Sequence, residues 1–71
     1  MDLKLNELMN RFVYHKPNEK KVIIHQALRD EFLALAEFVY QTCPEGRERS
    51  LAWTKLEEAM FWANASIARS E

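Results

Sequence analysis

The sequence contains few of the residues that break helices or cross-link small proteins. Its 71 residues include one glycine, two prolines and one cysteine. A single cysteine, Cys43, excludes an internal disulfide and any cysteine-based set of metal ligands. His15 and His25 are ten positions apart with no ligand pattern around them, so no metal site is predicted. Because so short a chain buries only about 60% of its unfolded surface, we expect additional stability to come from self-association.

Charge of one sign is also missing, since ten basic and eleven acidic residues leave a net charge of −1. Binding to DNA or RNA in general requires a basic surface, so neither is a predicted partner. A compact anionic ligand that needs only a few arginines remains compatible with this balance. No apolar run approaches the roughly 20 residues of a membrane span, and the N-terminus lacks signal-peptide features. We therefore expect a cytoplasmic protein, not attached to a membrane, with Cys43 reduced.

The remaining residues predict an all-α fold within a single domain, residues 1–71. Residues 1–18 form a short N-terminal helix, capped by Asp2, and a connector that begins where Pro17 excludes the helix. The apolar residues of this helix follow the helical spacing i, i+3, i+4, i+7. They are Leu5, Leu8, Met9 and Phe12.

Two longer helices are predicted over residues 19–43 and 47–70. Asn18 is a suitable N-cap for the first, and the turn Pro44-Glu45-Gly46 separates the two, with Gly46 as a tolerable cap for the second. Each helix of roughly 23 residues is about 35 Å long. Because the turn is short, the helices must run antiparallel, which gives a hairpin with an attached N-terminal helix.

Apolar stripes indicate how these helices pack. One stripe on each long helix is predicted to face the other: Ile24, Leu28, Phe32, Leu35 and Val39 against Trp53, Leu56, Met60, Ala63 and Ile67. Trp62, like Trp53, is interpreted as a packing residue and His25 as a surface residue.

The second long helix carries another seam, with heptad-like spacing: Ser50, Thr54, Glu57, Phe61, Asn64 and Ala68. It lies roughly 120° from the first stripe, so the hairpin partner cannot cover both. The first long helix also has surplus apolar residues, including Leu33, Ala34, Phe38 and Tyr40. These features predict a homo-oligomer with the last helix at an interface. The alternative is a solvated face on which Phe61 is simply exposed.

Two segments resemble a known family. Residues 43–69 read CPEGRERSLAWTKLEEAMFWANASIAR, and residues 11–17 read RFVYHKP. Both resemble the hairpin domain shared by phage anti-CBASS cyclic-oligonucleotide sponges and anti-Thoeris sponges of cyclic ADP-ribose signals. The resemblance implies a phage-encoded protein of the host cytoplasm that sequesters cyclic di- or trinucleotides, or cyclic ADP-ribose isomers, without cleaving them. It also implies a hexamer with ligands held between protomers.

The residue chemistry is compatible with such a ligand, whose phosphates need cationic donors and whose bases need flat side chains. The predicted ligand-binding residues are Arg11, Phe12, Tyr14, His15, Lys16, Arg47, Ser50, Thr54, Asn64 and Arg69. Each also has a structural interpretation: Arg69 suits a helix C-terminus, and Asn64 can set helix register. No nucleophile, acid–base pair, phosphate loop or cofactor motif is present, so no catalysis is predicted. The alternative function is a helical adaptor that oligomerises and binds a protein partner.

Overall fold

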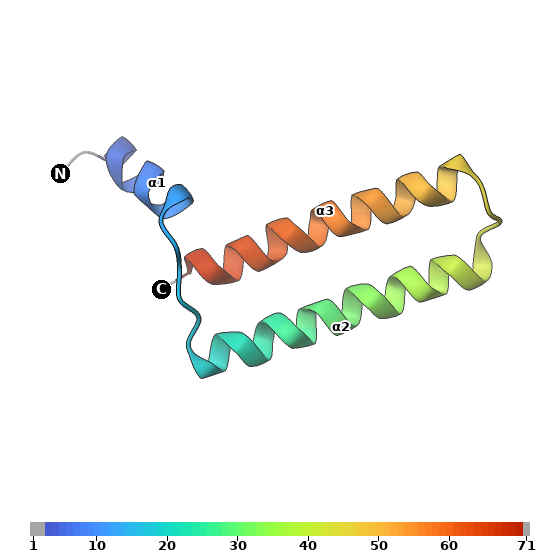
Figure 1. Ribbon diagram of the computed structural model, residues 1–71, viewed down its shortest axis with the longest axis horizontal. Coiled ribbons are helices and arrows are strands. Elements are labelled where there is room, and N and C mark those ends of the chain that lie inside the picture. Colours follow the sequence, from blue (N-terminus) through green and yellow to red (C-terminus); the bar gives the residue numbers. More distant parts are fainter. Residues whose placement is uncertain (1–2, 71) are drawn as a thin grey trace.

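The computed structural model describes residues 3–70, which form three helices (Figure 1). They are α1 (Leu3–Phe12), α2 (Glu19–Thr42) and α3 (Arg47–Arg69). Helices α2 and α3 lie side by side and antiparallel, and α1 projects beyond the open end of this hairpin. The predicted all-α fold, with a short helix followed by two long ones in contact, is confirmed. The predicted cap at Asp2 lies outside the described residues.

Specific hydrogen bonds define the ends of the hairpin helices. The side-chain Oδ1 of Asn18 accepts a hydrogen bond from the Lys21 amide at 2.8 Å, as expected of an N-cap. Gly46 precedes α3 in extended backbone and offers no side-chain cap. At the open end, Lys21 Nζ donates to the Ser70 carbonyl at 2.5 Å and so links the start of α2 to the residue after α3.

The interface between α2 and α3 follows the predicted stripe closely on α3 and less closely on α2. All five predicted α3 residues are half-buried, as are Leu28, Phe32 and Val39 of α2. The prediction is wrong for Ile24 and Leu35, which are 41% and 46% exposed. Their places are taken by His25 and Ala36, one residue further along. The other three predicted α2 positions are kept, so the contact line differs from the prediction by one residue at these two positions only.

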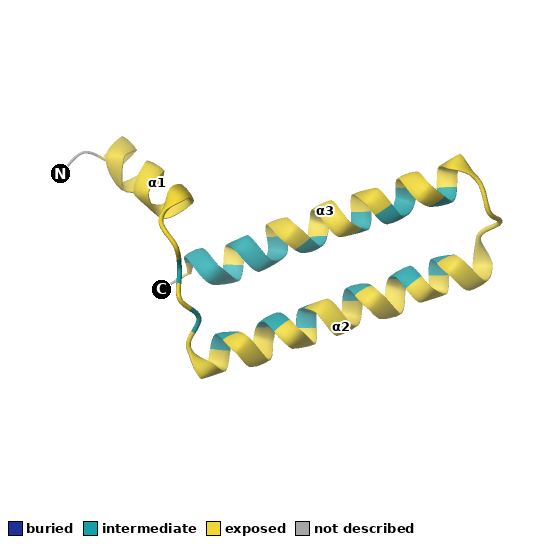
Figure 2. Cartoon of the chain, viewed as in Figure 1, coloured by how far each residue is buried: buried dark blue, intermediate teal, exposed yellow. Residues whose placement is uncertain are grey.

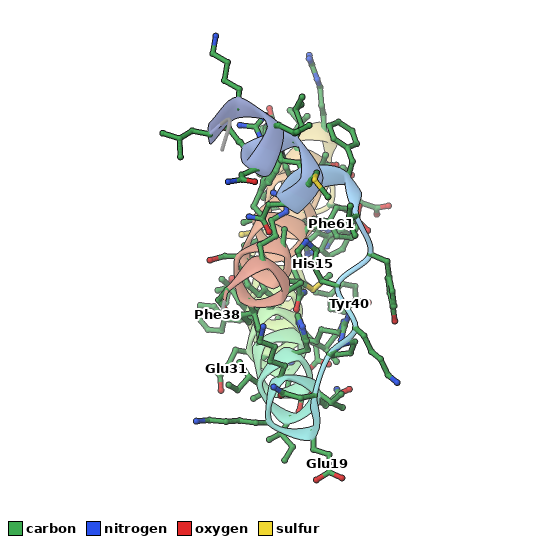
Figure 3. The ribbon with its side chains drawn as sticks, turned by 90° about the vertical axis from the view of Figure 1, so that its left-hand side faces the viewer. His15, Glu19, Glu31, Phe38, Tyr40 and Phe61 are labelled. Atoms are coloured by element: carbon green, nitrogen blue, oxygen red, sulfur yellow. The ribbon has the colours of Figure 1, made fainter. Side chains whose placement is uncertain are left out.

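The hairpin is a layer only one helix thick, and the chain including α1 has principal extents of 52 × 27 × 13 Å. None of the described residues is fully buried (Figure 2). Phe38 and Tyr40 lie on opposite sides of the layer, and Phe61 lies on the same side as Tyr40 (Figure 3). The surplus apolar residues predicted on α2 are therefore exposed on both faces.

The two tryptophans differ. Trp53 is half-buried, and its indole N–H donates to the Ala36 carbonyl at 3.1 Å, so its predicted packing role is confirmed. Trp62 is 63% exposed, so its packing role is not met within the single chain and stays a prediction. It projects from the outer surface of α3, where the hairpin partner does not reach.

Candidate functional site

A hollow of about 340 Å³ lies where the connector between α1 and α2 crosses the open end of the hairpin. We call it the connector pocket. The connector and the first turns of α2 supply its lining: Tyr14, His15, Pro17, Val22, His25, Gln26 and Arg29. One guanidinium, two imidazoles, a phenol and an amide thus face one small space, and no carboxylate lines it. This composition suits a planar ligand that carries negative charge.

Hydrogen bonds fix the imidazoles that line the connector pocket. The Nδ1–H of His25 donates to Asn64 Oδ1 at 2.6 Å. The Asn64 amide nitrogen donates to the Met60 carbonyl at 3.1 Å, which orients its oxygen toward His25. In the neutral ring, the Nε2 of His25 is then an acceptor. The Nε2–H of His15 donates to the Asn10 carbonyl at 2.6 Å and holds the connector against the end of α1.

The interpretation of His25 as a surface residue is wrong, because it is half-buried and bonded across the hairpin. The same contact places Asn64 at the edge of the hairpin interface, whereas Phe61 of the same predicted seam is 61% exposed. This geometry supports the interpretation of Asn64 as a structural residue. Its role in ligand binding stays a prediction, and within this chain Asn64 would act on a ligand by orienting His25.

The predicted N-terminal ligand-binding residues divide into two groups. Tyr14 and His15 line the connector pocket, and Lys16 lies between His15 and Pro17 on the same segment. Phe12 is exposed at the end of α1 and lines none of the hollows described in this section. Arg11 forms an exposed ion pair with Glu7, 2.7 Å from Nη2 to Oε1. The connector, and not α1 itself, supplies this part of the site.

The predicted residues on α3 are far apart within one chain. Arg47 and Ser50 lie near the turn, where the Thr54 hydroxyl donates to the Ser50 carbonyl at 3.1 Å. Arg69 ends α3 beside the connector (Figure 1). The 22 residue steps from Arg47 to Arg69 correspond to about 33 Å of helix. A single chain therefore does not bring these arginines to one ligand.

The prediction missed the three polar residues that α2 contributes to the connector pocket, His25, Gln26 and Arg29, and the apolar Pro17 and Val22. The spacing of the three polar residues along α2 places them beside one another on the second and third turns, and the sequence itself contains this periodicity. The amide nitrogen of Gln26 donates to Asp30 Oδ1 at 2.9 Å, which fixes its side chain. What the sequence did not show was the path of the connector over that surface.

A second cluster lies at the other end of the hairpin. The Tyr40 and Trp53 rings stack with centroids 6.3 Å apart and planes 13° from parallel. The Arg49 guanidinium carbon lies 5.2 Å from the Tyr40 centroid and 4.8 Å from the Trp53 centroid. Arg49 also donates to the Cys43 carbonyl at 3.4 Å. These contacts join α2, the turn and α3, so the cluster holds the closed end of the hairpin together.

Two further hollows lie along the helices. The larger, of about 580 Å³, runs between α2 and α3, and we call it the hairpin groove. Its apolar residues include Phe32, Leu33, Trp53, Leu56 and Met60. The smaller, of about 390 Å³, is formed on the outer surface of α3 by Glu58, Phe61, Trp62 and Ala65. Both leave large apolar side chains open to solvent in the single chain.

Residues 4–68 match the family model described as Acb2/Tad1, hairpin domain. No curated protein and no solved structure matches the chain significantly. The matched range includes the connector, all of α2, α3 up to Ala68 and each residue of the connector pocket. Among the helices of residues 3–70, none has the length and apolar character required to cross a bilayer.

Proposed function

Because the chain belongs to the Acb2/Tad1 hairpin-domain family, the phage anti-CBASS and anti-Thoeris sponges, we propose that it sequesters a cyclic nucleotide immune signal. The ligand is a cyclic di- or trinucleotide or a cyclic ADP-ribose isomer, bound in the host cytoplasm and not cleaved. The family is generally non-catalytic. The sponge acts by lowering the free concentration of the signal, so its function depends on affinity alone.

The observation that carries this proposal is the lining of the connector pocket. Arg29 supplies a guanidinium for a phosphate, because its donors match two phosphate oxygens at once. Tyr14 supplies a ring on which a base stacks. His25 presents Nε2 as an acceptor for an exocyclic amine or a ribose hydroxyl. No carboxylate lines the connector pocket, and Asp30, the acidic residue bonded to Gln26, lies outside that lining.

The functional unit in this proposal is a homo-oligomer, a hexamer by resemblance. The absence of any fully buried residue in 3–70 supports self-association, since a stable protein must cover more apolar surface than this chain covers alone. The separation of Arg47 from Arg69 along α3 also supports self-association, because one chain cannot bring both arginines to the same ligand. A neighbour running antiparallel brings the turn end of one α3 beside the connector end of another. A symmetric ring-shaped ligand then receives equivalent donors from two protomers.

The test is isothermal titration calorimetry of the purified protein with a panel of cyclic di- and trinucleotides and cyclic ADP-ribose isomers. We expect heat and saturation with at least one ligand class. Arg29→Gln removes at least one of the two charge-assisted hydrogen bonds, each worth about 1.5–3 kcal/mol, and should weaken that ligand by about 10-fold or more. Lys55→Gln is the matched control, since Lys55 is exposed and pairs with Glu58 outside the connector pocket.

Absence of heat with the whole panel, at micromolar protein that remains folded, would remove the sponge proposal. Equal weakening by Arg29→Gln and Lys55→Gln would show that general charge, and not the connector pocket, determines binding. If no ligand of the panel binds, the second candidate function is that of a helical adaptor. The exposed aromatic pair Phe61 and Trp62 favours that candidate, because it offers an apolar patch to a protein partner.

A further inference from the structure

Helix α1 presents an apolar stripe that its own chain leaves uncovered. Leu5, Leu8, Met9 and Phe12 share one face of the helix and are 53%, 53%, 54% and 81% exposed. A helix of ten residues is marginal in water without tertiary packing. The stripe therefore requires a surface to cover it.

The hairpin of the same chain does not provide that surface. Helix α1 extends beyond the open end, away from the body of α2 and α3 (Figure 1). The hydrogen bond from His15 Nε2–H to the Asn10 carbonyl, 2.6 Å long, folds the connector back on the last turn of α1. His15 also lines the connector pocket at the open end of the hairpin. It therefore contacts both α1 and the hairpin end, and helps to fix the direction in which α1 points.

The hairpin groove is long enough to hold α1, and its lining is apolar enough to cover the α1 stripe. Its α2 wall extends from Gln26 to Tyr40, about 21 Å of helix, and α1 is about 15 Å long. Apolar side chains, among them Leu33 and Met60, line its interior. An amphipathic helix lying in an apolar groove is a common mode of recognition.

The charges are complementary as well. The groove lining contains three carboxylates, Asp30, Glu37 and Glu57, and one cation, Arg29, so it is acidic by two charges. The described α1 carries Lys4 and Arg11 and one acidic residue, Glu7, so it is basic by one charge. Lys4 and Arg11 are seven residues apart on the same flank of the apolar stripe, and Glu7, which pairs with Arg11 at 2.7 Å, lies next to them on the side away from the stripe.

We propose that α1 of one protomer docks in the hairpin groove of a second copy of this chain. The exchange is reciprocal in a two-fold pair, so each copy donates one α1 and receives the other. The contact covers the α1 stripe and the groove floor together. This docking rests on the self-association included in the proposed function. It adds that the two associating surfaces are the α1 stripe and the hairpin groove.

Cross-linking between chains tests this docking. Two single-cysteine chains of different length are prepared in a Cys43→Ser background, one with Leu8→Cys on α1 and one with Leu33→Cys in the groove. They are co-expressed so that mixed oligomers form, and then oxidised mildly. The expected product on a non-reducing gel is a mixed dimer that contains one chain of each length. Because the two cysteines are on different chains, docking of α1 within its own chain gives no such product.

The matched control replaces Leu8→Cys by Glu7→Cys, which lies on the opposite face of α1, and its mixed dimer should be at least tenfold less abundant. Circular dichroism verifies that the cysteine variants keep their helical content. A missing mixed dimer, or equal yields from Leu8→Cys and Glu7→Cys, overturns the docking. Calorimetry on the unmodified protein is independent of this result, so ligand binding without the cross-link refutes only the placement of α1.

Discussion

The contact between His25 and Asn64 predicts a measurable coupling across the hairpin. The donor and acceptor are 2.6 Å apart in a partly buried position, and Asn64 also donates to the Met60 carbonyl. Replacing Asn64 by alanine leaves the His25 Nδ1–H without its acceptor, which costs about 1–3 kcal/mol for a buried group. Because both residues are half-buried and water reaches them, we expect the lower part, about 1–2 kcal/mol. In a domain of this size that lowers Tm by about 4–16 °C.

The assay is a double-mutant cycle with Asn64→Ala, His25→Ala and the double variant. Thermal unfolding is followed by circular dichroism at one fixed protein concentration, since the stability of an oligomer depends on concentration. The double variant should lose less than the sum of the single losses, by about 1 kcal/mol, because the second substitution removes a group already unpaired. A coupling below about 0.5 kcal/mol, the range of ordinary additivity, would refute the reasoning. An unchanged Tm with weakened ligand binding would assign Asn64 to the ligand instead.

Two further substitutions test the ends of the hairpin. Trp53→Phe removes the indole donor to the Ala36 carbonyl and should cost about 0.5–1.5 kcal/mol in denaturant unfolding; unchanged stability would contradict the assigned bond. Asn18→Ala removes the cap on the Lys21 amide and should cost about 1 kcal/mol. Asn18→Asp retains an acceptor oxygen and should stay close to the parent protein, so equal losses from both Asn18 variants would argue against capping.

The helices themselves could be predicted from the sequence because local signals define them. Asn18 is a favoured cap, Pro17 excludes helix before it, and the turn at Gly46 separates two long amphipathic segments. The apolar stripe of α3 was also predictable, since every member is half-buried as expected. Local periodicity decides these features without reference to the partner helix.

The exact contact line on α2 could not be predicted in the same way. His25 is polar and was interpreted as a surface residue, yet it replaces Ile24 at the interface. Its partner, Asn64, is 39 residues away in the sequence. Whether a polar residue faces inward depends on such a distant acceptor, because an unpaired polar group at an interface is costly. Sequence periodicity alone therefore favours the apolar Ile24 over His25 for this position in the α2–α3 interface.

The candidate site was predicted in part for a related reason. Tyr14 and His15 were identified from their aromatic and basic character, and both line the connector pocket. Arg29 lies in the middle of an otherwise ordinary helix, and only the path of the connector brings it into the same pocket. Arg47 and Arg69 lie at opposite ends of α3, so a single chain does not bring them together, and in the proposed function they meet one ligand only across neighbouring chains.

The most direct measurement of the central claim is recovery of the ligand. The protein is incubated with an equimolar cyclic nucleotide or cyclic ADP-ribose isomer, filtered to retain the complex, and then heated to denature the chain. The account predicts that the ligand is depleted from the first filtrate and appears unaltered, by chromatography and mass, after heating. A ligand that passes the filter with every member of the panel, or a product of different mass after heating, would contradict it.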